Sequence, residues 1–300
     1  LTKRGTKTSV IDLFSGPGGL SEGFACYNSG KKFGPFVSVE MDPVACNTLR
    51  LRKLFHELKG IKKLKEKYYN LVKSGNNLNW PDIKGDFGKY ADKVDESVWE
   101  HELGSKRPGS TCQEIEERLL NLGHKETDRL VLIGGPPCQA YSVIGRSSRK
   151  QMTERGDYAP EEDKRHFLYE WYLKILPRFK PDVFIMENVP GILSSRINGE
   201  GIFDRILKDL KKPGYKLFPL TRPVQEDMFQ EHDDYKIKSH LYGVPQARER
   251  VIILGIRADI LGNQAPLFLK EEGCNNSKSV LEGMPILRSG LSKIDRVKAK

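Results

Sequence analysis

The sequence of 300 residues is long enough for one large domain or two small ones. Charged residues make up 30% of the chain and its apolar runs are far shorter than a membrane span, which excludes an integral membrane protein. The formal net charge of +10 is compatible with a polyanionic partner.

Five apolar segments rich in β-branched residues predict buried strands. In chain order they cover residues 9–14, 36–40, 130–133, 183–187 and 250–256, with shorter candidate strands at 215–219 and 236–240. A Gly/Pro-rich turn or a plausible helix follows most of them. This alternation is typical of an α/β domain with a mostly parallel sheet and helical crossovers.

The stretch from residue 48 to about 97 interrupts this alternation with a basic, helix-prone sequence. Within it, residues 74–86 contain glycine and proline and predict a loop. We therefore expect a domain over residues 1–260 with an inserted helical segment at 48–97. Residues 261–300 carry no further core-forming segment and predict a linker.

A glycine-rich turn follows the first predicted strand, in the sequence Asp12-Leu-Phe-Ser-Gly16-Pro-Gly18-Gly19-Leu20. Glycines at a strand-to-helix turn let the backbone pass close to a bound nucleotide-like cofactor. Glu40 ends the second predicted strand, where a carboxylate accepts hydrogen bonds from ribose hydroxyls. The G-x-G-G spacing does not specify a pyrophosphate, and S-adenosylmethionine fits as well as a dinucleotide.

A second turn, Gly134-Gly135-Pro136-Pro137-Cys138, follows the third predicted strand of the parallel series. Two prolines fix the backbone of a sharp turn that delivers a thiol to the sheet edge where open α/β sheets bind ligands. Cys138 is therefore a candidate nucleophile. The other four cysteines are interpreted as ordinary packing residues. The five include no Cys-x-x-Cys pair, which excludes a zinc ribbon and favours a reducing compartment.

Two further motifs place polar groups at strand ends. Glu187 ends the strand at 183–187, and a buried carboxyl there can share a proton with an aromatic ring nitrogen. Arg248 and Arg250 open the last strand, where alternation predicts that both point to the same side. Guanidinium groups so placed can bind a phosphate, a base carbonyl or a carboxylate.

Taken in order, these motifs resemble the DNA (cytosine-5)-methyltransferase family. The matching elements are DLFSGPGGLSEGF, the strand that ends in Glu40, GGPPCQAYS, RHFLYEWYLKIL, MENVPG and VPQARERVIILGIR. The resemblance implies a Rossmann-like S-adenosylmethionine-dependent methyltransferase fold with helices on both faces of the sheet. It also implies double-stranded DNA as the partner, in a cytoplasmic enzyme of bacterial restriction–modification type.

The resemblance further implies residue roles for methyl transfer to carbon 5 of a flipped cytosine. Cys138 attacks carbon 6, Glu187 contacts ring N3 and the exocyclic amine, Arg250 meets the carbonyl oxygen, and Arg248 supports the nucleophile turn. The residues implied for the cofactor are Phe14, Ser15, Gly16, Gly18, Gly19, Leu20, Glu40, Met41, Glu102, Leu103, Pro136 and Leu168. Glu102 is the preferred acid for the adenine amine, with Asp86 close behind.

The sequence departs from the family pattern after residue 257. The target-recognition region and the final motif of the family are not visible, so we expect a C-terminal continuation or a second chain to supply them. Two alternatives stay open: a tRNA cytosine-5 methyltransferase of the same superfamily, and a cofactor-binding fragment that is inactive without its recognition region.

Overall fold

The structure is a computed structural model that describes residues 7–74, 78–137, 168–197, 199–223, 231–262, 265–273 and 276–284. Across those ranges no helix is both long and apolar enough to cross a membrane. Cys138 and the segment up to residue 167 lie outside the described residues.

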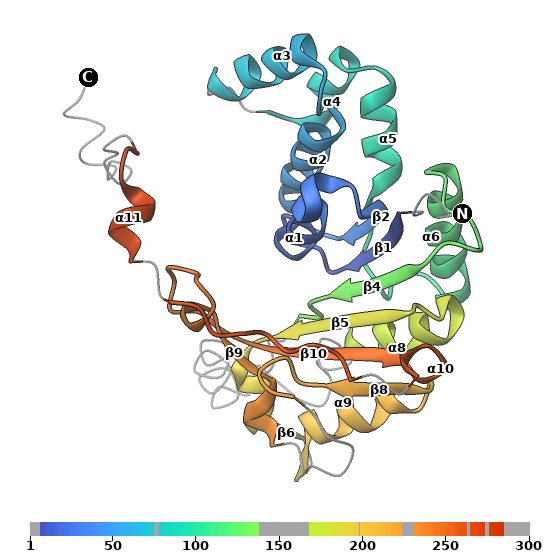
Figure 1. Cartoon of the computed structure of the whole chain (residues 1–300). Helices are drawn as coiled ribbons and strands as arrows, with labels where there is room; N and C mark the ends of the chain where they lie inside the picture. The colour runs from blue at the N-terminus through green and yellow to red at the C-terminus, as the bar shows by residue number, and fades with distance from the viewer. Residues whose placement is uncertain are drawn as a thin grey trace, which may run out of the picture.

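The centre of the molecule is a twisted sheet in the order β3-β2-β1-β4-β5-β10-β8, with β9 paired to β10 (Figure 1). Neighbours from β3 to β5 run parallel, whereas β10 is antiparallel to β5, β8 and β9. The strands are β1 (Thr8–Leu13), β2 (Phe33–Glu40), β3 (Val98–Glu100), β4 (Leu130–Gly134), β5 (Val183–Asn188), β8 (Tyr215–Phe218), β9 (Lys236–Lys238) and β10 (Glu249–Arg257). All seven strands expected from the sequence are therefore present.

Helices cover both faces of this sheet because alternate residues of a buried strand point to opposite sides. Ile11 and Leu13 of β1 belong to the main core, which also takes in side chains of α6, α8 and α9. Val10 lies in a separate cluster beneath α1. The helices on the sheet are α1 (Gly19–Cys26), α2 (Pro43–Glu57), α6 (Pro108–Asn121), α8 (Leu168–Phe179) and α9 (Ile202–Lys211).

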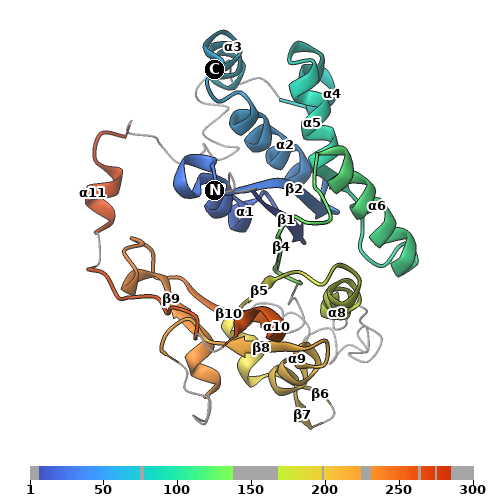
Figure 2. The same ribbon diagram turned by 45° about the vertical axis from the view of Figure 1, so that its right-hand side comes forward.

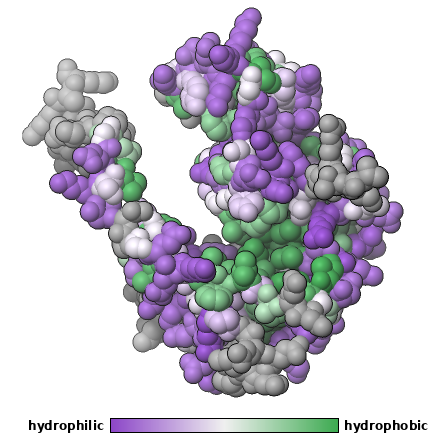
Figure 3. Space-filling model, in the orientation of Figure 1, coloured by the Kyte–Doolittle hydropathy of each residue, from purple (hydrophilic) through white to green (hydrophobic). Residues whose placement is uncertain are grey.

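Between β2 and β3 the chain builds a helical unit that packs on α2. Helices α3 (Lys62–Lys73), α4 (Trp80–Ile83) and α5 (Lys89–Ser97) surround a small core of their own. Its buried members are Leu54, Leu58, Trp80, Ile83, Phe87, Ala91 and Val94. The outer surface of this unit is largely hydrophilic, while hydrophobic side chains gather lower in the molecule (Figure 3).

The prediction of a loop over 74–86 was wrong in part. Trp80 and Ile83 start and end a short helix, and the 3-10 helix η2 (Lys84–Asp86) continues it. Pro81 occupies the first turn of α4, where a missing N–H removes no hydrogen bond. Burial of the Trp80 side chain, 3% exposed, outweighs the turn signal of the neighbouring glycine and proline.

Strand β3 was not among the strands predicted from apolar patterning, although the choice of Glu102 as the adenine acid assumes a strand in this region. It has three residues, of which Val98 and Trp99 are buried, and it follows α5 without a break. So short a run carries no measurable periodicity. Its register, with Glu100 opposite Glu40, makes it the edge strand beside β2.

The remaining elements are short. They are η1 (Tyr27–Gly30), η5 (Pro190–Ser194), β6 (Arg196–Ile197), β7 (Glu200–Gly201), η6 (His232–Tyr235), η7 (Ser239–Leu241), α10 (Ala258–Leu261) and α11 (Ser277–Leu281). Helix α11 stands apart from the sheet, as both views of the ribbon make clear (Figure 2). The division of the chain at residue 260 stays a prediction.

Candidate active site at the carboxyl edge of the sheet

The topology brings the predicted site residues to one edge of the sheet. Strands β1, β2, β3, β4 and β5 are parallel, so the residues that follow each of them lie at the same edge. Strand β10 runs the opposite way, and its first residues therefore reach that edge too. This explains how motifs from both ends of the chain meet.

The glycine-rich turn after β1 has a backbone that only glycine adopts easily. Gly16 and Gly18 have φ values of 53° and 86°, and Phe14 itself has a positive φ of 56°. A Cβ atom on Gly18 would come within 2.5 Å of Leu49 Cδ1, whereas one on Gly16 or Gly19 would meet nothing within 4 Å. The turn is thus tight against α2 and open on the side of Gly16.

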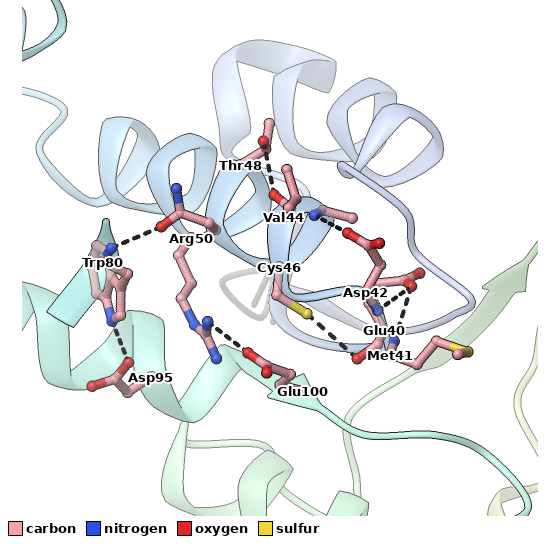
Figure 4. A network of polar contacts seen from close by, with 12 residues as sticks. Glu40, Met41, Asp42, Val44, Cys46, Thr48, Arg50, Trp80, Asp95 and Glu100 are labelled. Carbon is pink, nitrogen blue, oxygen red and sulfur yellow. Dashed lines mark hydrogen bonds and ion pairs between the residues drawn. The ribbon is translucent and has the colours of Figure 1, made fainter. Parts of the chain in front are cut away.

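Glu40 holds this turn through its carboxylate. Oε2 accepts a hydrogen bond from the Gly16 N–H at 2.7 Å, and Oε1 accepts from the N–H groups of Met41 and Asp42, both at 2.9 Å. Figure 4 shows the contacts of Glu40 with Met41 and Asp42 beside α2. Asp42 then caps α2 by accepting from the Ala45 N–H at 2.7 Å. The Met41 side chain is 60% exposed at the mouth of this site.

Asp12 lies fully buried in β1, immediately below the turn. Its Oδ2 atom has no hydrogen-bond partner among the described residues. Burial raises the pKa of Asp12 to about 6, although Ser21, Lys53 and Ser15 each favour the charged form. Burial likewise lowers the pKa of Lys53 to about 8. A buried acid and a half-buried amine therefore lie behind the turn.

The segment before Cys138 is anchored to β5. Gly134 ends β4, and the carbonyl oxygen of Pro136 accepts a hydrogen bond from Asn188 Nδ2 at 3.2 Å. Pro136 and Asn188 are both buried. Asn188 was not among the predicted site residues. The signal available for Asn188 was its place next to Glu187 at the end of a strand. Consecutive strand side chains point to opposite faces, so Asn188 reaches a different part of the turn from Glu187.

Glu187 and Arg250 form an ion pair next to the same turn. Arg250 Nε lies 2.6 Å from Glu187 Oε1, with the two side chains 23% and 30% exposed. The antiparallel register of β5 and β10 sets Ile252 opposite Glu187, which places Arg250 two residues further along. A Cβ atom on Gly135 would lie 2.9 Å from Glu187 Oε2. Because Gly135 has no side chain, the Glu187 carboxylate can lie against the turn.

Arg248 is exposed and precedes β10. Its N–H donates to the Gln246 carbonyl oxygen at 2.8 Å, and its own carbonyl oxygen accepts from the Ser239 N–H at 2.9 Å. The backbone at this position is fixed. The supporting role expected for the Arg248 guanidinium stays a prediction.

At the edge strand, the structure separates the two candidate acids for the adenine amine. Glu102 follows the end of β3 and is exposed, and the adjacent Leu103 is buried. Asp86 lies in η2 of the inserted unit and pairs with Lys67 at 2.7 Å. A third carboxylate, Glu100, ends β3 and pairs with Arg50 at 3.1 Å (Figure 4). Sequence reasoning missed Glu100 because the strand ends two residues before Glu102.

Of the other predicted cofactor residues, Ser15 and Leu168 lie where the fold brings them to this edge. The Ser15 hydroxyl donates to the Asp12 carbonyl oxygen at 2.7 Å. Leu168 is half-buried at the start of α8 and packs on the main core, as does Phe14. Leu20, in the first turn of α1, packs on the cluster around Val10.

A family described as C-5 cytosine-specific DNA methylase matches residues 99–286, which include the Pro-Pro-Cys turn, Glu187 and Arg250. The chain belongs to this methylase family. The resemblance read from the motifs is thereby confirmed.

Curated relatives of the methylase chain agree with that assignment. It is 32% identical over 292 residues to the type II methyltransferase M.Bpa9945I of Bacillus paralicheniformis, covering 93% of this chain and 61% of the relative. It is 28% identical to the type II methyltransferase M.BsuRI of Bacillus subtilis, covering 94% of this chain and 51% of the relative. The chain thus spans roughly half to three-fifths of the length of these relatives.

Solved structures confirm the predicted fold class. A DNA modification methyltransferase encoded within an Escherichia coli prophage aligns with a TM-score of 0.55 at 21% identity, covering 94% of this chain and 56% of that one. A DNMT2 mutant of Spodoptera frugiperda aligns with a TM-score of 0.50 at 15% identity, covering 93% and 61%. The methylase chain therefore has the α/β methyltransferase fold.

Proposed function

We propose that this chain carries the catalytic region of a DNA cytosine-5 methyltransferase that uses S-adenosylmethionine. The observation that carries the proposal is the Glu187–Arg250 pair at 2.6 Å, set against the turn that leads into Cys138. It puts an acid and a guanidinium beside the turn that precedes Cys138, at the ligand-binding edge of the sheet. Such a set can hold a pyrimidine by its polar edge while the thiol attacks the ring.

In the proposed reaction, the target cytosine leaves the duplex because its ring atoms are unreachable while stacked. The Cys138 thiolate forms a bond to carbon 6, and Glu187 donates or shares a proton at ring N3. Arg250 binds the carbonyl oxygen. Carbon 5 then bonds to the transferred methyl group and loses its proton, after which the bond between Cys138 and carbon 6 breaks and regenerates the ring.

The residues of the glycine-rich turn fit S-adenosylmethionine, which supplies the methyl group when bound. The open space above Gly16 and Gly19 leaves room for a ligand close to the backbone. The Glu40 carboxylate, already oriented by three N–H groups, has lone pairs left for ribose hydroxyls. For the adenine amine we propose Glu102, since it follows β3 at this edge, whereas Asp86 is engaged with Lys67 in the inserted unit.

We further propose that the target-recognition function belongs to a C-terminal continuation or to a second chain. The relatives are longer than this chain, which supports such a part. Large apolar side chains are also exposed near residues 265–284. These are Leu267, Phe268, Leu269, Val280, Leu281 and Met284. We propose a bacterial cytoplasmic setting on the strength of the type II relatives.

The test is covalent trapping on DNA that contains 5-fluorocytosine. Fluorine cannot leave as the proton does, so the enzyme stays bonded to carbon 6. We expect a wild-type adduct, dependent on S-adenosylmethionine, that disappears in Cys138→Ala, while binding of S-adenosylmethionine to that variant persists.

Two outcomes would redirect the proposal. Labelled methyl transfer to tRNA but not to DNA would assign an RNA substrate. Binding of S-adenosylmethionine without an adduct, followed by an adduct once the recognition part is added, would make the chain a region that depends on that part.

A further inference from the structure

Three metal-ligating side chains meet on the surface formed by α1 and α2, away from the residues assigned to the reaction. Glu22 and Cys26 are four residues apart on α1 and therefore share one face of that helix. His56 comes from the last turn of α2. One ligand atom from each residue lies within 4.8 Å of the other two.

The two distances that involve Glu22 are close to edges of a tetrahedral site, and the third, between Cys26 and His56, is within 4.8 Å. The distance from His56 Nε2 to Glu22 Oε1 is 3.0 Å, and that from Cys26 Sγ to the same Oε1 is 3.4 Å. Zinc bonds of ordinary length set at tetrahedral angles give edges of about 3.3 Å for nitrogen to oxygen and about 3.5 Å for sulfur to oxygen. To bind an ion in this way, the two measured distances need to lengthen by a few tenths of an ångström at most.

The surroundings orient the carboxylate and leave the cluster open to solvent. Arg52 Nη1 lies 3.7 Å from Glu22 Oε2, which keeps Oε1 turned toward His56 and Cys26. Glu22, His56 and Arg52 line a cavity of about 480 Å³ beside α1, α2 and β2. That cavity gives solvent access to Glu22 and His56, and Cys26 is exposed at the surface.

We infer that Glu22, Cys26 and His56 form a binding site for a zinc-like divalent cation. The donor set of one thiolate, one imidazole and one carboxylate is typical of zinc. Without the ion the three groups form a hydrogen-bonded cluster in which the thiol donates to Glu22. On binding, the metal takes the place of that proton, which passes to solvent as the metal–sulfur bond forms.

The site joins two helices that flank the glycine-rich turn. Helix α1 begins at Gly19, directly after the turn, and α2 begins just after Glu40. A metal bridge between Cys26 and His56 would restrict the movement of α1 against α2. The inference does not depend on the proposed reaction, since none of its three ligands takes part in it.

Cobalt(II) replaces zinc in such sites and reports its ligands by absorbance, so it serves as the probe. We expect the wild-type chain to bind one cobalt ion with a thiolate-to-metal charge-transfer band and the visible bands of tetrahedral cobalt. Cys26→Ser should remove the charge-transfer band. His56→Gln should weaken binding by roughly 100-fold, as expected for the loss of one ligand of a zinc-type site.

Matched controls come from the same chain. His232 pairs with the Asp204 carboxylate at 2.7 Å, outside the Glu22–Cys26–His56 cluster, so His232→Gln should leave cobalt binding unchanged. Cys274→Ser, a substitution outside the described residues, controls for thiols in general. A charge-transfer band that survives Cys26→Ser, equal affinity in His56→Gln, or no cobalt binding by the wild type would overturn the inference.

Alkylation of Cys26 gives a second readout that needs no substitution of the thiol. Zinc should slow the reaction of Cys26 with iodoacetamide, followed by mass spectrometry, in the wild type but not in His56→Gln. Equal alkylation rates with and without zinc would count against the site, whatever the variants do to folding.

Discussion

Gly135 is the residue on which the geometry of the acid beside the nucleophile turn depends most directly. Glu187 Oε2 occupies the space that a side chain at position 135 would need, at 2.9 Å from an added Cβ. Gly134 is similarly enclosed, by the Leu13 carbonyl oxygen and the Tyr172 ring. Gly134 therefore sets how closely β4 approaches β1 and α8, and Gly135 sets how closely the turn approaches Glu187 of β5.

Gly135→Ala should slow formation of the fluorocytosine adduct by about 100-fold, because displacing a reacting group by about 1 Å has an effect of that size. Adduct formation over time measures it. Gly85→Ala is the control, since an added Cβ there meets nothing within 4 Å. Equal rates in the two variants would mean that Glu187 does not need its observed position.

Single residues also mark where sequence reasoning failed. All four cysteines other than Cys138 were interpreted as packing residues, and Cys46 and Cys112 are indeed buried. Cys26 is exposed, and the interpretation was wrong for it. Cys26 is the last residue of α1, and the sequence alone does not decide whether a residue at a helix end is buried.

At the scale of elements, α1 offers two glycines in contrasting environments. Gly18 precedes the helix with a φ of 86° and is pressed against Leu49. Gly23 lies inside the helix, and an added Cβ there would meet nothing within 4 Å. The same substitution should therefore have opposite effects on stability at these two positions.

Gly18→Ala should lower the free energy of unfolding by at least about 1–2 kcal/mol, because alanine is strained at positive φ and its Cβ would overlap Leu49 Cδ1. Gly23→Ala should raise it by about 0.5–1 kcal/mol through helix propensity. Urea unfolding measures both. A stabilised Gly18→Ala protein would contradict the tight contact between the turn and α2.

The elements that the sequence predicted well are those that contain several consecutive apolar residues. Strands β1, β4, β5 and β10 are runs of apolar residues that lie between helices, and their existence and type were both correct. Strand β3 and helix α4 were missed because each is short and depends on distant partners. Val98 packs on Cys46 and Leu49, and Trp80 packs on Leu54 and Leu58. Such long-range packing overrides local signals.

At the scale of the whole molecule, the buried Asp12 makes stability depend on pH. A carboxyl whose pKa is raised by folding, here to about 6 from 3.8, binds more protons in the folded state than in the unfolded one between those values. The free energy of unfolding therefore falls as pH rises through this window. Above the folded-state pKa of about 6, the free energy of unfolding has lost the whole contribution of this carboxyl.

For this group the loss amounts to about 3 kcal/mol. Asp12→Asn removes the titration, so its stability relative to the wild type should rise by most of that amount between pH 4 and pH 7. Urea unfolding of both proteins across this range measures the difference. A difference that stays constant with pH would show that Asp12 is not held in a raised-pKa environment.

The location of the site was predictable because parallel strands bring the residues after their carboxyl ends to one edge of the sheet. The glycine-rich turn, Glu40, the Pro-Pro-Cys turn and Glu187 are ordered along that edge by the parallel topology alone. A carboxylate was one of three partners that the sequence left open for Arg248 and Arg250, but the sequence did not decide which contact forms. The pairing of Arg250 with Glu187 depends on the register of an antiparallel strand much later in the chain, and the hydrogen bond from Asn188 to Pro136 depends on the approach of β4 and β5.

The Glu40 carboxylate accepts hydrogen bonds from N–H groups of two segments that are 24 residues apart in the chain. A ligand that hydrogen-bonds to the Glu40 oxygens therefore changes the surroundings of three backbone N–H groups together. These belong to Gly16 after β1 and to Met41 and Asp42 before α2. In a nitrogen-15-labelled sample these three backbone amides form a natural reporter group. Their resonances would register occupancy of the ribose position without catalysis, without DNA and without an attached dye.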